Sequence, residues 1–141
     1  MTEKFHQLPI QIRFSDVDSF GHVNNNSYFS FYDLGKQEFF NDVLSKNFTT
    51  QDIVPVIANI QADFLMPIFY GDKVLVETRV GHLGEKSFML EQQAVSLDGT
   101  KVYCRCNTVL VCFSQSEKKA VPIPEDYRIA FETYTPRPYT F

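Results

Sequence analysis

The chain has 141 residues, 44% hydrophobic and 21% charged, which suits one globular domain spanning residues 1–141. Thirteen Lys and Arg against seventeen Asp and Glu give a formal net charge of -4 with no basic run, so no nucleic-acid partner is expected. No apolar run reaches the ~20 residues of a membrane span, and the N-terminus lacks a secretory-signal pattern, so we expect a cytoplasmic protein without membrane attachment.

The first predicted element is a strand over residues 10–16. Ile10, Ile12 and Phe14 alternate there with polar residues, which is the two-residue period of a half-buried strand. The strand leads directly into a polar segment that begins at Asp16.

A long amphipathic helix is predicted from Asn26 to Lys46, because apolar residues recur there at steps of three and four. Gly35 lies within this apolar series, where it costs ~1 kcal/mol relative to alanine. We therefore expect another backbone to approach the helix closely at Gly35. The series consists of Tyr28, Tyr32, Gly35, Phe39 and Val43.

Four further strands are predicted, with Gly- and Asp-containing turns between them that favour antiparallel hairpins. In the first of the four, alternate residues from Val54 to Met66 are apolar and should share one face. A short helix near Pro124 follows. The order indicates an α+β fold, an antiparallel curved sheet of about five strands wrapped on one long central helix. The four strands span residues 54–66, 73–82, 86–97 and 101–113.

Three cysteines are too few and too irregularly spaced for a disulfide framework or a zinc site, so neither a metal nor another cofactor is expected. Cys104 and Cys106 share one face of the last strand with Thr108, and all three are small enough to let a helix come close. We interpret the cysteines as reduced thiols of the core.

The polar segment between strand and helix carries the chemistry. The first N–H groups of a helix have no intrahelical partners and carry a partial positive charge, so they can stabilise an oxyanion. Asp18, on the preceding loop, could act on a carbonyl held at that helix start as a general base or as a nucleophile. Gly21 would allow a tight turn, and the three asparagines before Ser27 are candidate helix caps. The segment therefore predicts acyl-transfer chemistry without a serine or a metal.

Asp18-x-x-Gly21-x-Val23, with Tyr28 five residues on and Tyr70-Gly71-Asp72 before a strand, resembles the 4-hydroxybenzoyl-CoA thioesterase branch of the hotdog-fold superfamily. The resemblance extends from about residue 10 to about residue 128. The string DVD followed by HVNN is also similar to the matching segment of acyl-carrier-protein thioesterases.

This resemblance implies an acyl-CoA thioesterase of the hotdog fold. It implies that Asp18 is the catalytic carboxylate and that the backbone N–H of Asn25 polarises the thioester carbonyl. The acyl-carrier branch has an acid, an asparagine and a histidine at the positions of Asp18, Phe20 and His22. Phe20 departs from that pattern, and His22 is a candidate for catalysis, substrate contact or a structural hydrogen bond.

The resemblance further implies that Lys86 and Ser87 contact the CoA moiety and that the site lies between the subunits of a homodimer or of a tetramer of dimers. Tyr28 is expected in the core or in the wall of an acyl pocket. Asp16 continues the strand parity and is expected to form hydrogen bonds within the loop.

Two alternatives to hydrolysis remain at this stage. The chain could be a non-catalytic acyl-CoA binding or sensing module, although a sensor that regulates transcription would need a DNA-binding appendage. It could also be a hotdog dehydratase or hydratase, which needs an acid and a histidine across a β-hydroxyacyl chain. The acyl group, and whether it is carried by CoA or by a carrier protein, are open.

Overall fold

The computed structural model describes residues 5–45 and 48–135. Two 3-10 turns (Phe14–Asp16 and Phe48–Thr50) accompany two α-helices and six strands. The helices are α1 (Asn25–Leu44) and α2 (Glu125–Thr133), and the strands are β1 (His6–Ile10), β2 (Ile53–Phe64), β3 (Val74–Leu83), β4 (Ser87–Ser96), β5 (Val102–Ser114) and β6 (Lys119–Ala120). No helix in the described part of the chain is long and apolar enough to cross a membrane.

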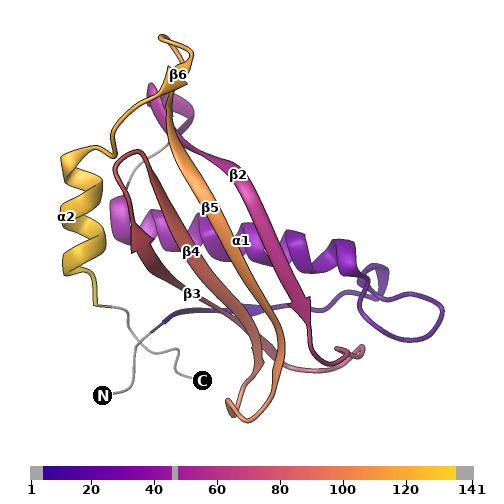
Figure 1. Ribbon diagram of the computed structural model, residues 1–141. Helices are drawn as coiled ribbons and strands as arrows, with labels where there is room; N and C mark the ends of the chain where they lie inside the picture. The colour runs from indigo at the N-terminus through magenta and orange to yellow at the C-terminus, as the bar shows by residue number, and fades with distance from the viewer. Residues whose placement is uncertain (1–4, 46–47, 136–141) are drawn as a thin grey trace.

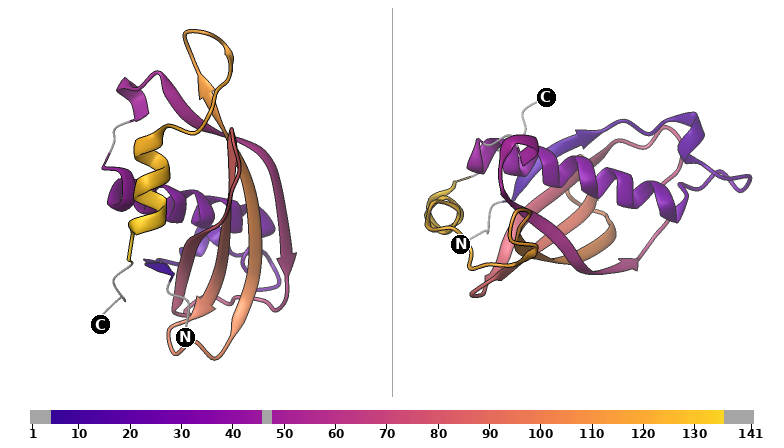
Figure 2. Two further views of the ribbon diagram at one scale, coloured as in Figure 1. Left: turned by 60° about the vertical axis from the view of Figure 1, so that its left-hand side comes forward. Right: turned by 90° about the horizontal axis from the view of Figure 1, so that it is seen from above.

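The strands form one antiparallel sheet in the order β1-β3-β4-β5-β2, and the two-residue β6 pairs with β5. The sheet curves around α1, and α2 lies near one end of α1 (Figures 1 and 2). The predicted α+β architecture of about five strands around one long helix is confirmed. The helix prediction is also confirmed, although its expected last residue, Lys46, lies outside the described residues.

The strand connections follow the hairpin prediction only in part. β3–β4 and β4–β5 are adjacent antiparallel pairs, as predicted. β2 does not pair with β3; it pairs with β5 at one side of the sheet, while β1 pairs with β3 at the other. The segment after β2 therefore crosses to the far side of the sheet and passes the start of α1 on its way (Figure 1).

The prediction for the first strand is wrong in position. β1 ends at Ile10, and residues 14–16 form a 3-10 turn instead of a strand. The Asp16 carboxylate accepts a hydrogen bond from the Arg13 backbone N–H at 2.8 Å, and the Asp16 N–H bonds the Arg13 carbonyl at 2.9 Å. This local turn competes with strand pairing and overrides the alternating pattern.

The helix α1 buries its apolar face against the concave side of the sheet. Tyr32 has no exposed surface, and it packs in one core cluster with Tyr28 and Phe31 and with buried residues of β3, β4 and β5. A second cluster, around Phe39 and Phe40, continues the core to α2. The three free cysteines are buried, as expected, because their small side chains lie on the helix-facing side of β5.

Gly35 is closely approached, but by side chains and not by the backbone that the sequence led us to expect. A Cβ atom at Gly35 would lie 2.6 Å from Val76 Cγ1, 3.0 Å from Gln92 Nε2 and 3.3 Å from Thr78 Oγ1. Gln92 Nε2 also donates to the Tyr32 carbonyl and to the Thr78 hydroxyl, both at 3.0 Å. The glycine thus lets α1 sit directly on a hydrogen-bonded contact with β3 and β4.

Gly35→Leu should lower the melting temperature. Overpacking costs ~1 to 3 kcal/mol, which exceeds the gain of at most ~1 kcal/mol in helix propensity. Thermal unfolding of the wild type, Gly35→Ala and Gly35→Leu should show stability falling as the side chain grows. An unchanged or higher melting temperature for Gly35→Leu would show that the contact with Val76 is not a close one.

The strand β2 changes its facing near its middle. The register with β5 shifts between Ile57 and Asn59, so the alternation is broken at Ala58. Ile60 and Phe64 pair with β5 residues that face the helix, whereas Val54 and Val56 pair with β5 residues that face away from it. The single face predicted from Val54 to Met66 is therefore wrong for its first half, because one extra residue inverts the parity.

Candidate active site

The segment between residues 16 and 24, hereafter the site loop, folds back on itself at the start of α1. Val17 and Val23 form an isolated antiparallel bridge, and the Asp18 N–H donates to the His22 carbonyl at 2.8 Å. Gly21 has φ of +83°, a conformation that favours glycine, and its N–H bonds the Asp18 carbonyl. The predicted tight turn at Gly21 is thus present.

The site loop is also tied to the segment that follows β2. The Val23 N–H donates to the Ile68 carbonyl at 2.8 Å, and His22 forms an isolated bridge with Phe69. The crossing segment therefore supports the loop and places its own side chains beside the start of α1.

Asp18 is half-buried, and its carboxylate has one occupied oxygen. Oδ1 accepts hydrogen bonds from the Phe20 N–H at 2.9 Å and from the His22 N–H at 3.2 Å. Within the described residues, Oδ2 accepts none. The loop backbone thus fixes the orientation of the carboxylate while one oxygen stays available for water or substrate.

The start of α1 is not capped by a side chain. Asn24 is the N-cap by position, with φ of -61° and ψ of 143°, but it makes no side-chain cap hydrogen bond. The expectation that the asparagines serve as caps is therefore wrong for Asn24. In the described part of the chain, the N–H groups of Asn25 and Asn26 have no hydrogen-bond acceptor, so they remain available to a ligand.

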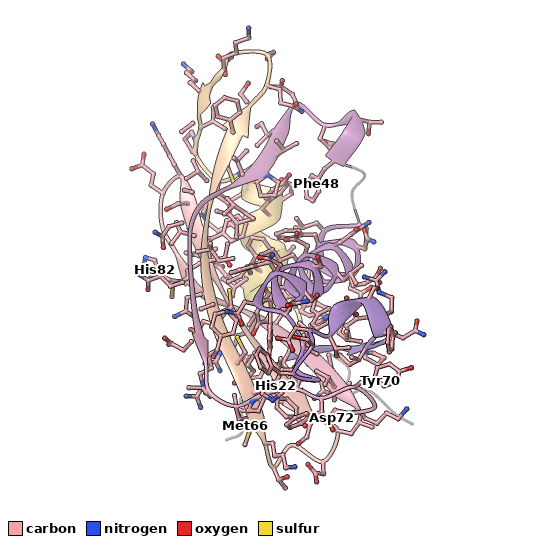
Figure 3. The ribbon with its side chains drawn as sticks, turned by 90° about the vertical axis from the view of Figure 1, so that its right-hand side faces the viewer. His22, Phe48, Met66, Tyr70, Asp72 and His82 are labelled. Carbon is pink, nitrogen blue, oxygen red and sulfur yellow. The ribbon has the colours of Figure 1, made fainter. Side chains whose placement is uncertain are left out.

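A cavity of about 510 Å³ joins these groups. Asp18, His22, Asn25 and Tyr28 all line it, so the structure brings four of the predicted site residues together. Its other wall consists of the end of β2 and the segment after it, a contribution that sequence reasoning missed. Figure 3 shows His22 and Met66 close together near one end of α1. The added wall residues are Phe64, Leu65, Met66 and Pro67.

Tyr28 forms the inner part of this cavity. It is buried, and its ring meets that of Phe64 edge-on at a centroid distance of 5.2 Å. Burial raises the pKa of the Tyr28 hydroxyl to about 12, so the group is neutral near pH 7. Tyr28 therefore contributes an apolar wall and a neutral hydroxyl, and no charge.

The side chains of His22 and Phe20 lie in different environments. The His22 ring packs edge-on against Phe69 at a centroid distance of 4.9 Å, which holds it at the cavity wall. Phe20 is 81% exposed and does not line the cavity. The residue that departs from the acyl-carrier pattern is thus turned toward solvent.

Asp16 lies next to the site but has a different environment. It is buried, and its carboxylate accepts hydrogen bonds from Arg13 and from the Ser27 hydroxyl. Burial alone would raise the pKa of Asp16, but these hydrogen bonds and the Arg13 charge outweigh it and lower the pKa below its ordinary value. Asp16 thus joins the turn before the site loop to the first turn of α1.

Asp16→Asn should destabilise the protein, and more so near neutral pH than in acid. Because the pKa of Asp16 is lower in the folded chain than in the unfolded one, its contribution is present above the unfolded value of ~3.9 and disappears as the pH falls through the folded value. Melting temperatures of wild type and variant, measured from pH 7 to pH 3, should converge toward the acid end. A constant difference across this range would contradict an ionised structural Asp16.

The predicted CoA-contact residues lie far from the cavity within one chain. Ser87 pairs with Val111 on β5, whereas Phe64, at the cavity, pairs with Cys104 on the same strand. Seven residues of strand separate the two levels, which is about 23 Å. Lys86 and Ser87 therefore belong to the hairpin at the opposite end of the sheet, beside α2, where Arg128 bonds the Gly84 carbonyl at 2.6 Å.

Comparison with known proteins identifies the family. The sequence model of the thioesterase-like superfamily matches residues 12–131. The chain belongs to this superfamily. The predicted kinship with the 4-hydroxybenzoyl-CoA thioesterase-like hotdog proteins is thereby confirmed, and the chain is an enzyme of the thioester hydrolase class.

Individual relatives agree with this assignment. The acyl-CoA thioesterase YbgC of Haemophilus influenzae is 21% identical over 137 residues, covering 93% of this chain and 97% of that protein. The PA2801 protein of Pseudomonas aeruginosa superposes with a TM-score of 0.82 at 29% identity, covering 90% of this chain and 98% of its own. A thioesterase from Thermus thermophilus, solved with coenzyme A and zinc, gives a TM-score of 0.79 at 28% identity over 90% of this chain and 97% of that one.

The zinc in that last structure has no evident counterpart among the residues described here. No group of three or more His, Cys, Asp or Glu side chains in residues 5–45 and 48–135 is arranged to hold a metal ion.

Proposed function

We propose that the protein hydrolyses acyl-CoA thioesters, with Asp18 as the reactive carboxylate and the start of α1 as the oxyanion site. The observation that supports this most directly is the shared cavity, which is lined by a loop-fixed carboxylate and by a helix start whose first N–H groups have no hydrogen-bond acceptor among the described residues. A carbonyl bound at the Asn25 N–H would have its carbon exposed to Asp18 or to a water beside it.

In the general-base route, Asp18 takes a proton from water as the oxygen attacks the thioester carbon. The oxyanion forms against the helix N–H groups and then collapses, and the C–S bond breaks. The CoA sulfur leaves as a thiolate and takes up a proton, which yields free acid and CoA. In the nucleophilic route, the Asp18 oxygen attacks the carbon directly, and water then hydrolyses the mixed anhydride.

Single turnover in ¹⁸O-labelled water separates the two routes. If Asp18 is the nucleophile and water attacks the carboxyl carbon of Asp18, the label enters the Asp18 side chain and the first product acid lacks it. If the label enters the product acid and the protein stays unlabelled, water has attacked the acyl carbon, either directly with Asp18 as general base or in the mixed anhydride, and trapping of an acyl-enzyme separates these two cases. Mass spectrometry of the peptide that contains Asp18 gives the readout.

The alternative functions find less support in the geometry. A dehydratase needs its acid and histidine on opposite sides of the substrate. Asp18 and His22 instead share one loop, in which the Asp18 N–H donates to the His22 carbonyl and the His22 N–H donates to the Asp18 carboxylate. A binding module would not need a carboxylate oriented by two N–H groups at an uncapped helix start.

A panel of acyl-CoA thioesters, assayed by release of free CoA thiol, tests the proposed activity. Short aliphatic, long aliphatic and aromatic acyl groups belong in the panel, with acyl-carrier-protein thioesters beside them. Turnover of at least one CoA thioester above the rate without protein is expected. If several bind and none is cleaved, the chain is an acyl-CoA binding module.

The buried free cysteines fit a reducing compartment, and we propose a cytoplasmic location.

We also propose that two chains associate through β2. This strand ends the sheet, and in the described residues only its β5 side is paired. A free 12-residue strand edge, with its row of unpaired backbone groups, is a surface that proteins normally cover. Antiparallel pairing of two β2 edges would bring the β3–β4 hairpin of one chain toward the cavity of the other, as a CoA contact by Lys86 and Ser87 requires.

Light scattering at micromolar concentration should accordingly give at least twice the chain mass of 16.3 kDa. The expected species is a homodimer or a tetramer of dimers, because symmetric closed assemblies satisfy a strand edge in both copies. A strictly monomeric species that still hydrolyses acyl-CoA would contradict both the β2 interface and a CoA contact from a second chain.

A further inference from the structure

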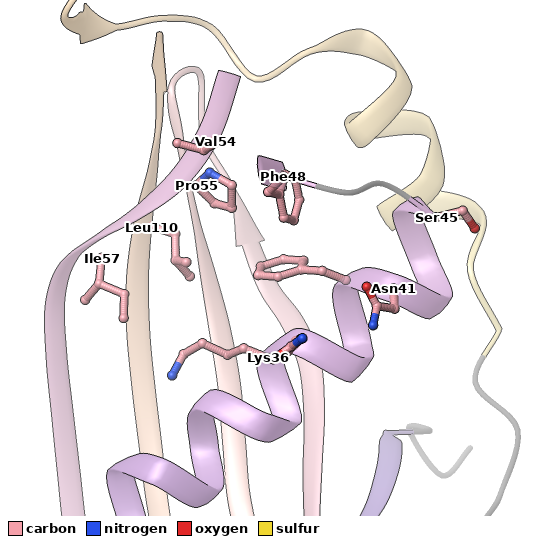
Figure 4. A pocket seen from close by; sticks show the side chains of 10 residues that line it. Lys36, Asn41, Ser45, Phe48, Val54, Pro55, Ile57 and Leu110 are labelled. Carbon is pink, nitrogen blue, oxygen red and sulfur yellow. The ribbon is translucent and has the colours of Figure 1, made fainter. Parts of the chain in front are cut away.

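A second cavity of about 650 Å³ lies toward the other end of α1, between that helix and the first half of β2. Its walls are mostly apolar, but one charged side chain, Lys36, belongs to the lining (Figure 4). Lys36 extends from α1 toward the side of β2. The apolar lining residues are Phe40, Phe48, Val54, Pro55, Ile57 and Leu110.

Lys36 is buried without adequate compensation. Its side chain is 6% exposed, and within the described residues its Nζ donates no hydrogen bond. The nearest opposite charge is Asp33 Oδ1 at 3.5 Å, on a side chain that is 69% exposed and therefore well solvated. A buried ammonium group carries three donors and a large desolvation cost, which a single solvated carboxylate offsets only in part. The site therefore favours a further anion.

An apolar surface connects this lysine with the active-site cavity. Phe64 lines the active-site cavity and Ile57 lines the second cavity, with Ile60 between them on the same helix-facing side of β2. These three side chains are 43%, 46% and 36% exposed, although they belong to the face that elsewhere forms the core. Partly exposed apolar side chains of β2 thus extend from the active-site cavity to the second cavity, and the strip that they form beside α1 is hereafter called the groove.

The position of Lys36 along this groove follows from its place on α1. Lys36 lies eleven residues after Asn25 on α1, which is ~16.5 Å along the helix axis. Side chains of a helix lean toward its N-terminus, so the ammonium group lies nearer to the active-site cavity than the Lys36 backbone does. An acyl chain of moderate length could therefore reach from Asn25 to Lys36.

We propose that Lys36 is a specificity-determining residue that binds the remote carboxylate of an ω-carboxyacyl thioester, whose apolar chain lies in the groove between α1 and β2. This inference rests on the proposed function. A carboxylate suits the site better than a neutral oxygen, because it forms charge-assisted hydrogen bonds and compensates the buried ammonium charge. The lining of the second cavity combines one cation, Lys36, with six apolar residues and with the polar residues Gln37, Asn41 and Ser45. A single carboxylate on an apolar chain suits this lining better than the several charges of the CoA phosphates do.

The test compares matched pairs of thioesters, adipyl-CoA with hexanoyl-CoA and suberyl-CoA with octanoyl-CoA. The wild type should prefer the ω-carboxy member of at least one pair in kcat/KM. Lys36→Met keeps the length of the stem and removes the charge, so it should lower that preference by about 10- to 100-fold, as expected for a lost hydrogen bond to a charged group. The readout is the ratio of the two kcat/KM values, so a loss of activity shared equally by both members is not a loss of preference.

Lys119→Met serves as the matched control, because Lys119 is an exposed lysine on β6, outside both cavities. It changes the net charge equally and should leave the preference unaltered. Equal kcat/KM values of the wild type for the ω-carboxy and neutral members of both pairs would overturn the proposal, even if Lys36→Met failed to fold. So would a Lys36→Met protein that changes its oligomeric state but keeps the wild-type preference, since Lys36 would then pair with a second copy of the chain.

Binding measurements keep this test separate from the proposed hydrolysis. Calorimetry with Asp18→Asn protein and intact adipyl-CoA or hexanoyl-CoA reports the affinity difference without turnover. If the wild type cleaves no thioester, the proposed function fails. Tighter binding of adipyl-CoA than of hexanoyl-CoA, lost on the Lys36→Met substitution, would still confirm the role of Lys36. Equal affinities for the two ligands would overturn that role whether or not the protein is active.

Discussion

Asp18→Asn is expected to lower kcat/KM for the best acyl-CoA substrate by about 100- to 10,000-fold, the range for loss of a positioned base. The amide oxygen of asparagine can still accept the Phe20 and His22 N–H groups that Oδ1 accepts in the wild type. The loop should therefore keep its shape while the charge and the basicity disappear. Melting temperature and acyl-CoA affinity should stay near the wild-type values.

Asp52→Asn is the matched control for this variant. Asp52 also accepts hydrogen bonds in a turn, from the Ser114 hydroxyl at 2.7 Å and the Ser116 N–H at 2.8 Å, but it precedes β2 at the end remote from the cavity. Removing its charge should leave kcat/KM nearly unchanged. If Asp18→Asn keeps more than about a tenth of wild-type activity, which loss of a base does not allow, or loses activity only by unfolding, Asp18 is a structural loop residue.

Asn25→Pro should lower kcat by about 100- to 1,000-fold, because it deletes the N–H group proposed to hold the oxyanion. Asn25 is the first helical residue, where proline is well tolerated. Asn24 before it is already extended, with ψ of 143°, as a residue preceding proline needs to be. The helix should therefore survive a substitution that removes one donor from the cavity.

Asn25→Ala separates the backbone of this residue from its side chain. It keeps the N–H group, and the Asn25 side chain is exposed, so activity should remain close to that of the wild type. Circular dichroism and thermal unfolding establish that the proline variant is folded. Full activity of a folded Asn25→Pro protein would move the oxyanion site away from Asn25, whereas a large loss in Asn25→Ala would assign a role to the side chain.

The sequence was most informative where one periodic pattern governs a whole element. The apolar series of α1 predicts both its extent and its buried face, because its members keep steps of three and four from Tyr28 to Phe39. Prediction failed where a local contact competes with the period. The Asp16 turn displaces the first strand, and the irregularity at Ala58 inverts the facing of Val54 and Val56. Neither the turn nor the irregularity can be predicted from the alternation of apolar and polar residues.

The site residues could be predicted where they are close in sequence, and not where distant parts of the chain meet. Asp18, Gly21 and Asn25 could be recognised because they lie within one short segment that the chain folds locally. The wall from Phe64 to Pro67 could not, because it reaches the cavity only through the pairing of β2 with β5. The sequence also contains a pattern that indicates a special role for Lys36. One row of the helix, with residues at steps of four, has a single cation among apolar residues: Tyr28, Tyr32, Lys36 and Phe40.

The burial of the three thiols has a practical consequence for enzymology. Burial raises the pKa of Cys104 and Cys112 to about 11 and also raises that of Cys106, so little reactive thiolate exists in the folded chain at neutral pH. Aromatic disulfide reagents that detect released CoA should thus encounter almost no background from the native enzyme. The same reagents should modify all three cysteines once the chain unfolds, which would make the rate of thiol labelling a direct record of how often the core opens.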